Sequence, residues 1–257
     1  YLMKILGIIP ARFASTRLEG KPLKDICGKT MIQRVYEKAT QALEHVYIAT
    51  DDSRIEAEVK SFAGNVIMTS AEHTTGTNRC VEAYNIVQKE LKIDFDAVIN
   101  IQGDEPLLEP EILISLANCF NDSSTEMATL IRPVHDKKEL LSTSDIWVVI
   151  DKNDYALYFS REIIPYVRGA HKDDWIEHHA FYKHIGMYGF TPKAIKQFAS
   201  MNQTSLEKAE SLEQLRWLEN GGKIKVAHTN HHALSVDTQE DLDEVIEIIQ
   251  KRGIKFD

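Results

Sequence analysis

Cysteine and long apolar runs are both scarce in this sequence. The three cysteines, Cys27, Cys80 and Cys119, are widely separated and form no Cys-x-x-Cys motif. Their spacing argues against a disulfide framework and against a zinc site built on cysteine. No apolar run reaches the ~20 residues of a membrane-spanning helix, and no secretory signal is evident near Met3, which we expect to be the natural start. We therefore expect a cytoplasmic protein with reduced thiols and no membrane partner.

Positive charge is also in the minority. Lysine and arginine number 30 against 39 aspartates and glutamates, which gives a net charge of -9. Because a nucleic-acid backbone attracts basic surfaces, this balance argues against a nucleic-acid partner. Any site for a smaller polyanion has to be local.

Apolar strands alternate with helical segments along the first half of the 257-residue chain. The expected strands cover residues 4–10, 45–52, 65–70 and 96–106, and the expected helices cover residues 30–43, 54–63, 77–91 and 110–120. This alternation predicts an α/β fold with a mainly parallel central sheet and helices on both faces. Ligands of such sheets bind beyond the carboxyl ends of the strands, so the loops after Pro10, Thr50, Ser70 and Gln102 form the candidate site edge.

The pattern changes after about residue 132. Aromatic-rich β segments follow with no long helix between them, at residues 146–151, 155–161 and 178–191. They predict a smaller antiparallel insertion. The remaining elements are an expected helix, strand and helix at 205–220, 223–229 and 238–252, where Ser205 and Thr238 are the expected N-caps. We therefore predict an α/β domain of residues 1–132 and 192–257 and a β-rich subdomain of residues 133–191.

The loop after the first strand is rich in cations and small residues. In "IIPARFASTRLEGKPL", Arg12, Arg17 and Lys21 supply positive charge. Small residues that let backbone amides approach a ligand are Ala11, Ala14, Ser15, Thr16 and Gly20. The loop lacks the spacing of a Walker A or a GxGxxG motif, yet guanidinium groups and an ammonium suit phosphate oxygens. It predicts a phosphate site, with a solvated basic loop as the alternative.

Two acidic motifs are candidates for a metal site. "NIQGDEP" places Asp104 and Glu105 after a strand that we expect to be central, where a carboxylate can hold a magnesium ion bound to phosphates. They could instead cap the next helix. Asp237 precedes the helix cap Thr238, and such residues are usually structural. A shared magnesium site requires Asp237 to face Asp104 across the same sheet edge.

Three further polar residues carry little information on their own. His184 lies between aromatics in "KHIGMYGF", and a lone histidine in an apolar strand is more often a core residue than a ligand. Glu213 and Gln214 lie on a glutamate-rich helix, which usually means a solvated face. The neighbouring histidines lack the spacing of a zinc site.

Taken together, these motifs resemble one family. "IIPARFASTRLEGKPL", "NIQGDEPL", "YALYFSR", "KHIGMYGF", "LEQLR" and "VDTQEDL" are similar, in this order and over nearly the whole chain, to 3-deoxy-manno-octulosonate (Kdo) cytidylyltransferases, or CMP-Kdo synthetases. The first motif is shared with other sugar nucleotidyltransferases, whereas "YALYFSR" and "LEQLR" narrow the resemblance to the Kdo enzymes. The chain departs from the family pattern at Glu19, Thr30 and Asn78, and Glu19 places an anion within the phosphate loop.

The resemblance implies a nucleotide-diphospho-sugar transferase-like fold and a reaction. The cytidylyl group of CTP is transferred to Kdo, giving CMP-Kdo and pyrophosphate for lipopolysaccharide biosynthesis, with Mg²⁺ as cofactor and a homodimer as the assembly. The β-rich subdomain is then expected to serve sugar binding and dimerisation. The alternatives are an enzyme for 8-amino-Kdo or a sialic acid, a sugar-1-phosphate nucleotidyltransferase, and a non-catalytic nucleotide-binding protein.

The resemblance also assigns roles by position. Arg12 and Lys21 would hold the triphosphate, with Arg17 near the phosphates and the sugar acid, and these three are the expected catalytic residues. Asp104 and Asp237 would ligate magnesium. The other implied contacts are Ala11, Gly76, Arg79 and Gln102 for the nucleotide, and Arg161, His184, Glu213 and Gln214 for the sugar acid.

Overall fold

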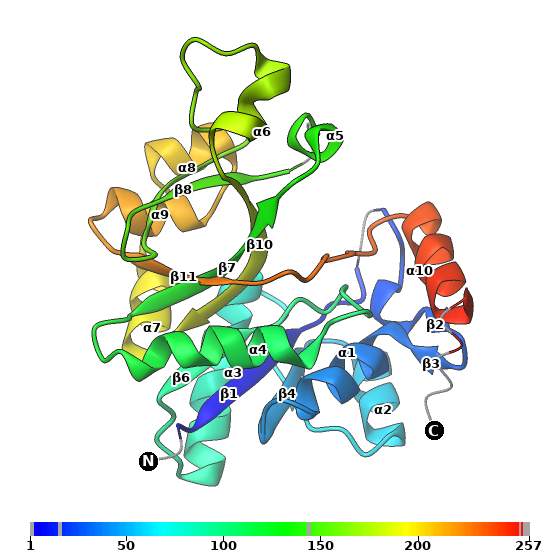
Figure 1. Ribbon diagram of the computed structural model, residues 1–257. Helices are drawn as coiled ribbons and strands as arrows, with labels where there is room; N and C mark the ends of the chain where they lie inside the picture. The colour runs from blue at the N-terminus through cyan, green and yellow to red at the C-terminus, as the bar shows by residue number, and fades with distance from the viewer. Residues whose placement is uncertain (1–2, 15–16, 143–144, 252, 254–257) are drawn as a thin grey trace. The chain divides into compact units, whose positions relative to one another are not determined.

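The described part of the chain forms two compact units. A computed structural model describes residues 3–14, 17–142, 145–251 and 253. The first unit comprises residues 1–114 and 232–257, and the second unit comprises residues 115–231 (Figure 1). The loop residues Ser15 and Thr16 lie outside the described residues.

The first unit is built on a parallel sheet in the order β6-β1-β4-β5. The strands of the first unit are β1 (Ile5–Pro10), β2 (Asp25–Ile26), β3 (Lys29–Thr30), β4 (His45–Thr50), β5 (Val66–Met68) and β6 (Ala97–Asn100). Of these, β2 and β3 form a separate two-stranded sheet. The helices of this unit are η1 (Lys21–Leu23), α1 (Met31–Thr40), α2 (Ser53–Ser61), α3 (Gly76–Leu91) and α10 (Gln239–Lys251), and α4 (Pro110–Asn118) contains the boundary between the units. The predicted α/β fold with a mainly parallel sheet among helices is confirmed.

Strand β1 lies between β6 and β4, and most of its side chains are buried. Leu6, Ile8 and Ile9 are fully buried, as expected for a strand of a parallel sheet that is covered on both faces. In the ladders of β1, Ile8 pairs with Tyr47 of β4 and with Asn100 at the end of β6. The carboxyl ends of β1 and β6 therefore lie side by side.

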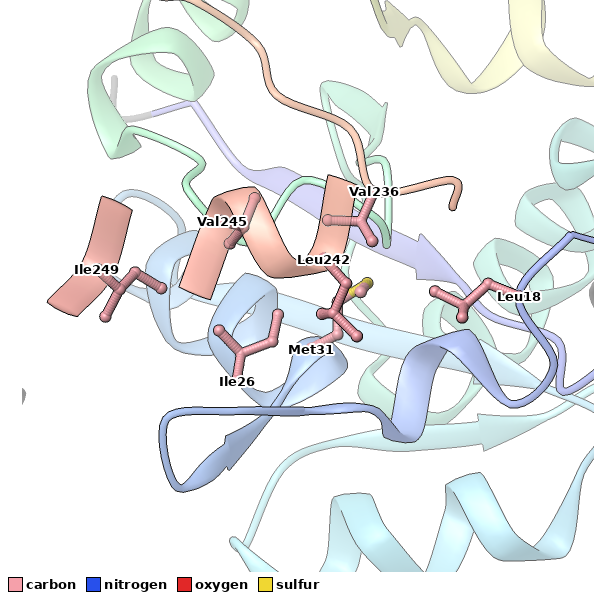
Figure 2. Packing of buried hydrophobic residues seen from close by; sticks show 7 residues of the cluster. All are labelled: Leu18, Ile26, Met31, Val236, Leu242, Val245 and Ile249. Carbon is pink, nitrogen blue, oxygen red and sulfur yellow. The ribbon is translucent and has the colours of Figure 1, made fainter. Parts of the chain in front are cut away.

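The C-terminal helix α10 packs on the segment that follows β1. Figure 2 shows the buried apolar cluster that joins them, formed by Leu18, Ile26, Met31, Val236, Leu242, Val245 and Ile249. Burying these side chains contributes roughly 1.5–3 kcal/mol each. The cluster holds the start of α10, and with it Asp237, against the loop that carries the cations.

The second unit contains a mixed, largely antiparallel group of strands. Strand β10 (Phe181–Phe190) pairs antiparallel with β7 (Met127–Val134) and β8 (Trp147–Ile150), β8 pairs antiparallel with β9 (Ala156–Ser160), and β11 (Ile224–His228) runs parallel to β7. The helices are η2 (Cys119–Asn121), α5 (Lys137–Leu140), η3 (Lys172–Asp174), α6 (Trp175–His178), α7 (Pro192–Ser200), α8 (Ser205–Glu210) and α9 (Gln214–Glu219). The antiparallel pairing predicted around residues 146–191 is present.

Strand β10 is interrupted by a bulge. Ile185 pairs with Leu130 and Tyr188 pairs with Thr129, so the register shifts across Gly186 and Met187. A bulge bends its strand and redirects neighbouring side chains. Here it lies next to His184.

The prediction of a single helix over residues 205–220 is wrong. Two helices, α8 and α9, occupy this stretch, because Ser211 adopts a left-handed conformation with φ of 53° that no helix can continue through. The N-cap is Thr204 rather than Ser205, and it forms a capping box with Glu207. The break lets Arg216 of α9 reach back to the Glu207 carboxylate.

The observed units divide at different positions from the predicted domains. The first unit ends at residue 114 and resumes at residue 232, whereas the sequence suggested breaks at 132/133 and 191/192. The strand pairings explain the difference, since β10 pairs with β7 along its length and β7 pairs with β11. The functional roles given to the two domains stay predictions.

Candidate active site

A cavity of about 950 Å³ lies in the first unit at the edge that the strand pattern predicted. Its volume is that of a site for a sizeable small molecule. It is lined by Pro10, Ala11, Arg12, Ala14, Arg17, Glu19, Lys21, Pro22, His73, Thr74, Thr75, Gly76, Arg79, Gln102, Gly103, Asp104 and Asp237. All nine residues predicted for the phosphate, nucleotide and metal contacts are among them.

Lys21 lies between the two carboxylates. Its Nζ donates to Asp104 Oδ2 at 2.8 Å and to Asp237 Oδ1 at 3.0 Å. Burial lowers the pKa of Lys21, but the charges and hydrogen bonds of Asp104 and Asp237 outweigh this effect and leave the pKa raised. Asp237 and Asp104 therefore converge on one cationic atom. They face each other at the same sheet edge, as a shared magnesium site would require.

Backbone hydrogen bonds fix both carboxylates. The Val236 N–H donates to the Asp104 carbonyl at 2.9 Å, which ties the two acidic segments together. Asp241 accepts from the backbone N–H groups of Asp237 and Thr238 at 2.9 and 2.8 Å, and its own N–H donates to Thr238 Oγ1 at 3.2 Å. Thr238 therefore does cap α10, and the cap itself orients Asp237 toward the cavity.

The two arginines of the loop are exposed at the cavity wall. Arg17 Nη2 lies 3.0 Å from Asp237 Oδ2, with 64% of the side chain exposed. In water such a pair is weak, so Arg17 can exchange this carboxylate for a ligand anion at little cost.

Glu19 is the anion that the sequence left unexplained. Its charge acts on Arg54 of α2: hydrogen bonds that Arg54 donates to Asp52 raise the pKa of Arg54, burial opposes them, and the charges of Asp52 and Glu19 add to the rise. Arg54 also lies over the Phe13 ring, 3.3 Å from its centroid. Glu19 therefore acts on the charge of a side chain that packs on Phe13 of the loop, and it also lines the cavity.

Gly20 is required where the loop folds back. Its φ is +65°, and a Cβ there would lie 3.0 Å from the Phe13 ring. We expect Gly20→Ala to lower the free energy of unfolding by ~2 kcal/mol, since it combines left-handed strain with a displaced ring. The control is Gly28→Ala, at φ +83° with nothing within 4 Å, for which strain alone predicts ~1 kcal/mol. Urea unfolding of both variants tests this, and equal losses would show that the Phe13 contact has no role.

Arg79 is held rigidly at the cavity wall. Its Nη1 donates to Thr69 Oγ1 at 2.6 Å, its Nη2 lies 3.3 Å from Asp51 Oδ1, and it is almost fully buried. The N-terminus of α3 opens beside it, where the Thr75 hydroxyl accepts from the Asn78 N–H at 3.2 Å. A helix start with its free amides favours an anion.

Two residues at this edge escaped the sequence analysis. His73 lines the cavity and its Nε2 contacts the Glu82 carboxylate, which also accepts from the Ser70 N–H at 2.9 Å. Burial raises the pKa of Glu82, but these hydrogen bonds outweigh it and leave the pKa lowered. A histidine in a polar loop after a short strand carries no pattern that would have singled it out.

Glu105 differs sharply from Asp104 although the two are adjacent. It is 5% exposed, and burial together with the Asp104 charge raises its pKa to about 7. The alternative that Asp104 and Glu105 merely cap the next helix does not describe Asp104, whose carboxylate accepts from Lys21.

The residues implied for the sugar acid lie in the second unit. His184 and Gln214 are buried. Burial raises the pKa of Tyr188, the charge of Glu213 adds to the rise, and the Tyr188 ring lies 5.5 Å from that of His184. His184, Glu213 and Gln214 thus belong to one region of this unit.

Arg161 lies at the end of β9 and is anchored to the loop before α9. Its Nε donates to the Glu210 carbonyl at 2.6 Å and its Nη2 to the Ser211 carbonyl at 3.3 Å. The Glu210 carboxylate in turn accepts from the Arg161 N–H and from Ser160 Oγ, both at 2.9 Å. The left-handed turn at Ser211 therefore connects Arg161 to the segment that carries Glu213 and Gln214.

No cluster of three or more histidine, cysteine, aspartate or glutamate side chains suited to a metal occurs within residues 3–14, 17–142, 145–251 and 253. The paired carboxylates nevertheless fit Mg²⁺, because this ion usually takes one or two carboxylates and keeps several waters. Lys21 Nζ already shows that a cation can lie between them. None of the helices described is long and apolar enough to cross a membrane.

The chain is similar to known proteins along most of its length. The sequence pattern of the family described as "Cytidylyltransferase" matches residues 6–224. The 3-deoxy-manno-octulosonate cytidylyltransferase of Parabacteroides distasonis is 48% identical over 98% of this chain and all of its own length. The enzyme of the same name from Fusobacterium nucleatum is 49% identical over 99% of this chain and all of its own length.

A solved structure is similar throughout. The CMP:2-keto-3-deoxy-manno-octonic acid synthetase complexed with CTP has a TM-score of 0.88 at 37% identity, covering 97% of this chain and 99% of that one. A Leptospira borgpetersenii cytidylyltransferase, at 18% identity and a TM-score of 0.59, shows the shared fold alone.

Proposed function

The chain belongs to the 3-deoxy-manno-octulosonate cytidylyltransferases, and from this premise we propose that it activates Kdo with CTP to give CMP-Kdo and pyrophosphate. It is a cytidylyltransferase, and its product would feed lipopolysaccharide biosynthesis. We further propose that it works in the cytoplasm, as a homodimer and with magnesium.

The observation that carries the proposal is the convergence of Asp104 and Asp237 on Lys21 inside the cavity. The reaction transfers the cytidylyl group of CTP to a sugar acid and releases pyrophosphate, so two anions must approach each other. Repulsion between them is the main barrier, and preorganised cations are the effective way to lower it. A cavity lined by cations and by two metal-competent carboxylates is suited to this task.

Asp104 and Asp237 are the residues that would hold magnesium. When bound, the ion would neutralise phosphate charge and lower the pKa of a hydroxyl beside it. The two carboxylates fit the ion because both carry negative charge and both converge on one cationic atom.

The cations of the loop would act on the phosphates directly. Arg12 and Lys21 would bind the triphosphate, while Arg17 gives up Asp237 for an incoming anion. The start of α3 at Gly76 offers backbone amides to the nucleotide. Ala11, Gln102 and the immobile Arg79 complete the proposed nucleotide contacts.

The second unit would bind the sugar acid through Arg161, His184, Glu213 and Gln214. Arg161 would pair with the carboxylate of Kdo, as guanidinium groups do. The buried Gln214 and His184 would contact hydroxyl groups. The anomeric hydroxyl would attack the α-phosphorus of CTP in line, so no side-chain nucleophile is needed.

Pyrophosphate release tests the proposal. We expect release only when CTP, Mg²⁺ and Kdo are present together, and none when any one is omitted. A panel with 8-amino-Kdo, a sialic acid and a sugar 1-phosphate separates the rival substrates. Faster turnover of any of these acids than of Kdo would overturn the substrate assignment, and no release with any of them would overturn the activity.

Lys21→Met tests the phosphate role of the loop. We expect kcat/KM for CTP to fall by ~100- to 1000-fold, because the variant removes a preorganised cation and leaves two carboxylates unbalanced. Lys24→Met is the matched control, since Lys24 lies in the same segment but is not a lining residue of the cavity. A similar loss in both variants would mean that the segment's fold, rather than the Lys21 charge, is responsible.

A further inference from the structure

The Thr129 hydroxyl lies within hydrogen-bond distance of three groups around the bulge in β10. Its Oγ1 is 2.8 Å from the Met187 carbonyl, 3.3 Å from the Ile185 carbonyl and 2.9 Å from His184 Nε2. Thr129 itself has no exposed surface. All three contacts are therefore made away from water.

The proton count decides how these groups are arranged. A hydroxyl has one proton to donate and lone pairs to accept with, whereas a carbonyl oxygen can only accept. The Thr129 proton is therefore directed at the nearer carbonyl, that of Met187. The Ile185 carbonyl is the more distant acceptor. An unprotonated His184 Nε2 would then place one lone pair against another at 2.9 Å. Nε2 must carry the ring proton and donate to Thr129.

The other ring nitrogen is left as a bare acceptor. His184 Nδ1 is fully buried and has no hydrogen-bond partner among the described residues. The ring is enclosed by aromatic neighbours, with Phe159 at 4.9 Å and Tyr188 at 5.5 Å between centroids. Burial lowers the pKa of His184 to about 3, so the ring is neutral at physiological pH.

We propose that Thr129 is a positioning residue that holds His184 as the Nε2–H tautomer, so that Nδ1 accepts a hydrogen bond from a hydroxyl of the bound sugar acid. The second part of this statement rests on the proposed function. His184 then selects a ligand group that can donate, and it acts as neither a general acid nor a general base. Thr129 gains this role because the bulge points two carbonyls at one hydroxyl.

A matched pair of variants isolates the hydroxyl. Thr129→Val keeps the branched shape and removes the hydroxyl, whereas Thr129→Ser keeps the hydroxyl and removes a methyl group. Both leave every cavity residue of the first unit unchanged. Since valine also removes a donor that lies within hydrogen-bond distance of two bulge carbonyls, thermal unfolding of both variants identifies any loss of fold.

The tautomer is measured without substrate. Histidine-selective ¹⁵N labelling, with His184→Gln to identify the signal, distinguishes a protonated ring nitrogen from an unprotonated one. We expect Nε2–H and bare Nδ1 in the parent and in Thr129→Ser, and a mixture of tautomers in folded Thr129→Val. A protonated Nδ1 in the parent, or an unchanged tautomer in Thr129→Val, would overturn the positioning role of Thr129.

Kinetics then test the hydrogen bond to the ligand. We expect Thr129→Val to raise KM for Kdo roughly tenfold, as for one lost hydrogen bond, with KM for CTP unchanged and with Thr129→Ser close to the parent. An unchanged KM for Kdo, in a variant whose tautomer has shifted, would overturn the contact with the sugar acid. The proposed function fails separately, through the parent's own pyrophosphate release: no release with Kdo, or faster release with another acid of the panel.

Discussion

Asp104→Asn is expected to lower kcat by at least ~1000-fold while leaving the protein folded. The amide keeps the size and polarity of the side chain, and Lys21 keeps its bond to Asp237. The substitution removes the negative charge that would bind magnesium and balance Lys21. Pyrophosphate release under saturating CTP, Kdo and Mg²⁺ measures the loss, and circular dichroism and thermal unfolding measure the fold.

Asp243→Asn is the control for this variant. This substitution removes the same charge in the same unit. Asp243 lies on the exposed face of α10, and an amide there can still accept from Gln239 Nε2, now 2.9 Å away. We expect its activity to match that of the parent. Near-normal turnover of Asp104→Asn would refute the role of Asp104 in holding the metal.

Glu207→Gln is expected to lower the free energy of unfolding by ~3 kcal/mol, because it removes the carboxylate that pairs with the buried Arg216 charge. Glu207 is 3% exposed, accepts from Arg216 Nε at 2.8 Å and also contacts Arg216 Nη2. Urea unfolding at pH 7 measures the loss. Glu219→Gln is the control, because Glu219 accepts from Ser205 Oγ and the Leu206 N–H at an exposed site, where ~0.5 kcal/mol is expected.

The same pair predicts a dependence on pH. Burial raises the pKa of Glu207, but the hydrogen bonds of Arg216 and Thr204 outweigh burial and leave the pKa below its ordinary value of 4.5. A lowered folded pKa gives a stabilisation that is complete above the unfolded pKa and is lost as the pH falls through the folded one. The difference between the parent and Glu207→Gln should therefore be constant from pH 6 to 8 and shrink below pH ~4.5. A difference that stays constant down to pH 3 would contradict the ion pair.

Much of the site could be predicted because parallel strands order their loops at one edge. The apolar run that ends at Pro10 and the acids that follow Asn100 belong to adjacent strands, so their loops had to meet. Asp237 could be assigned only conditionally, since nothing in the local sequence shows which loop a distant helix cap will face. The tie between Val236 and the Asp104 carbonyl is a tertiary contact.

The features that sequence patterns missed depend on single backbone angles or on distant partners. The hairpin of β2 and β3 turns at Cys27 and Gly28, with φ values of 52° and 83°, and a cysteine gives no turn signal. The helix break at Ser211 runs against a periodicity that continues through it. The link of Glu19 to Arg54 depends on how α2 lies beside the loop, which no spacing along the chain reveals.

The ion pair between Lys21 and Asp237 joins positions 216 apart in the chain. The cluster in Figure 2 closes the same long loop with apolar side chains from residues 18–31 and 236–249. Contacts of such sequence separation form late, because their loop entropy is lost before they stabilise anything. A chain emerging from the ribosome would thus have its parallel sheet before Lys21 and Asp237 meet. In a refolding experiment, secondary structure should return well ahead of turnover, and the delay would measure the docking of the last helix.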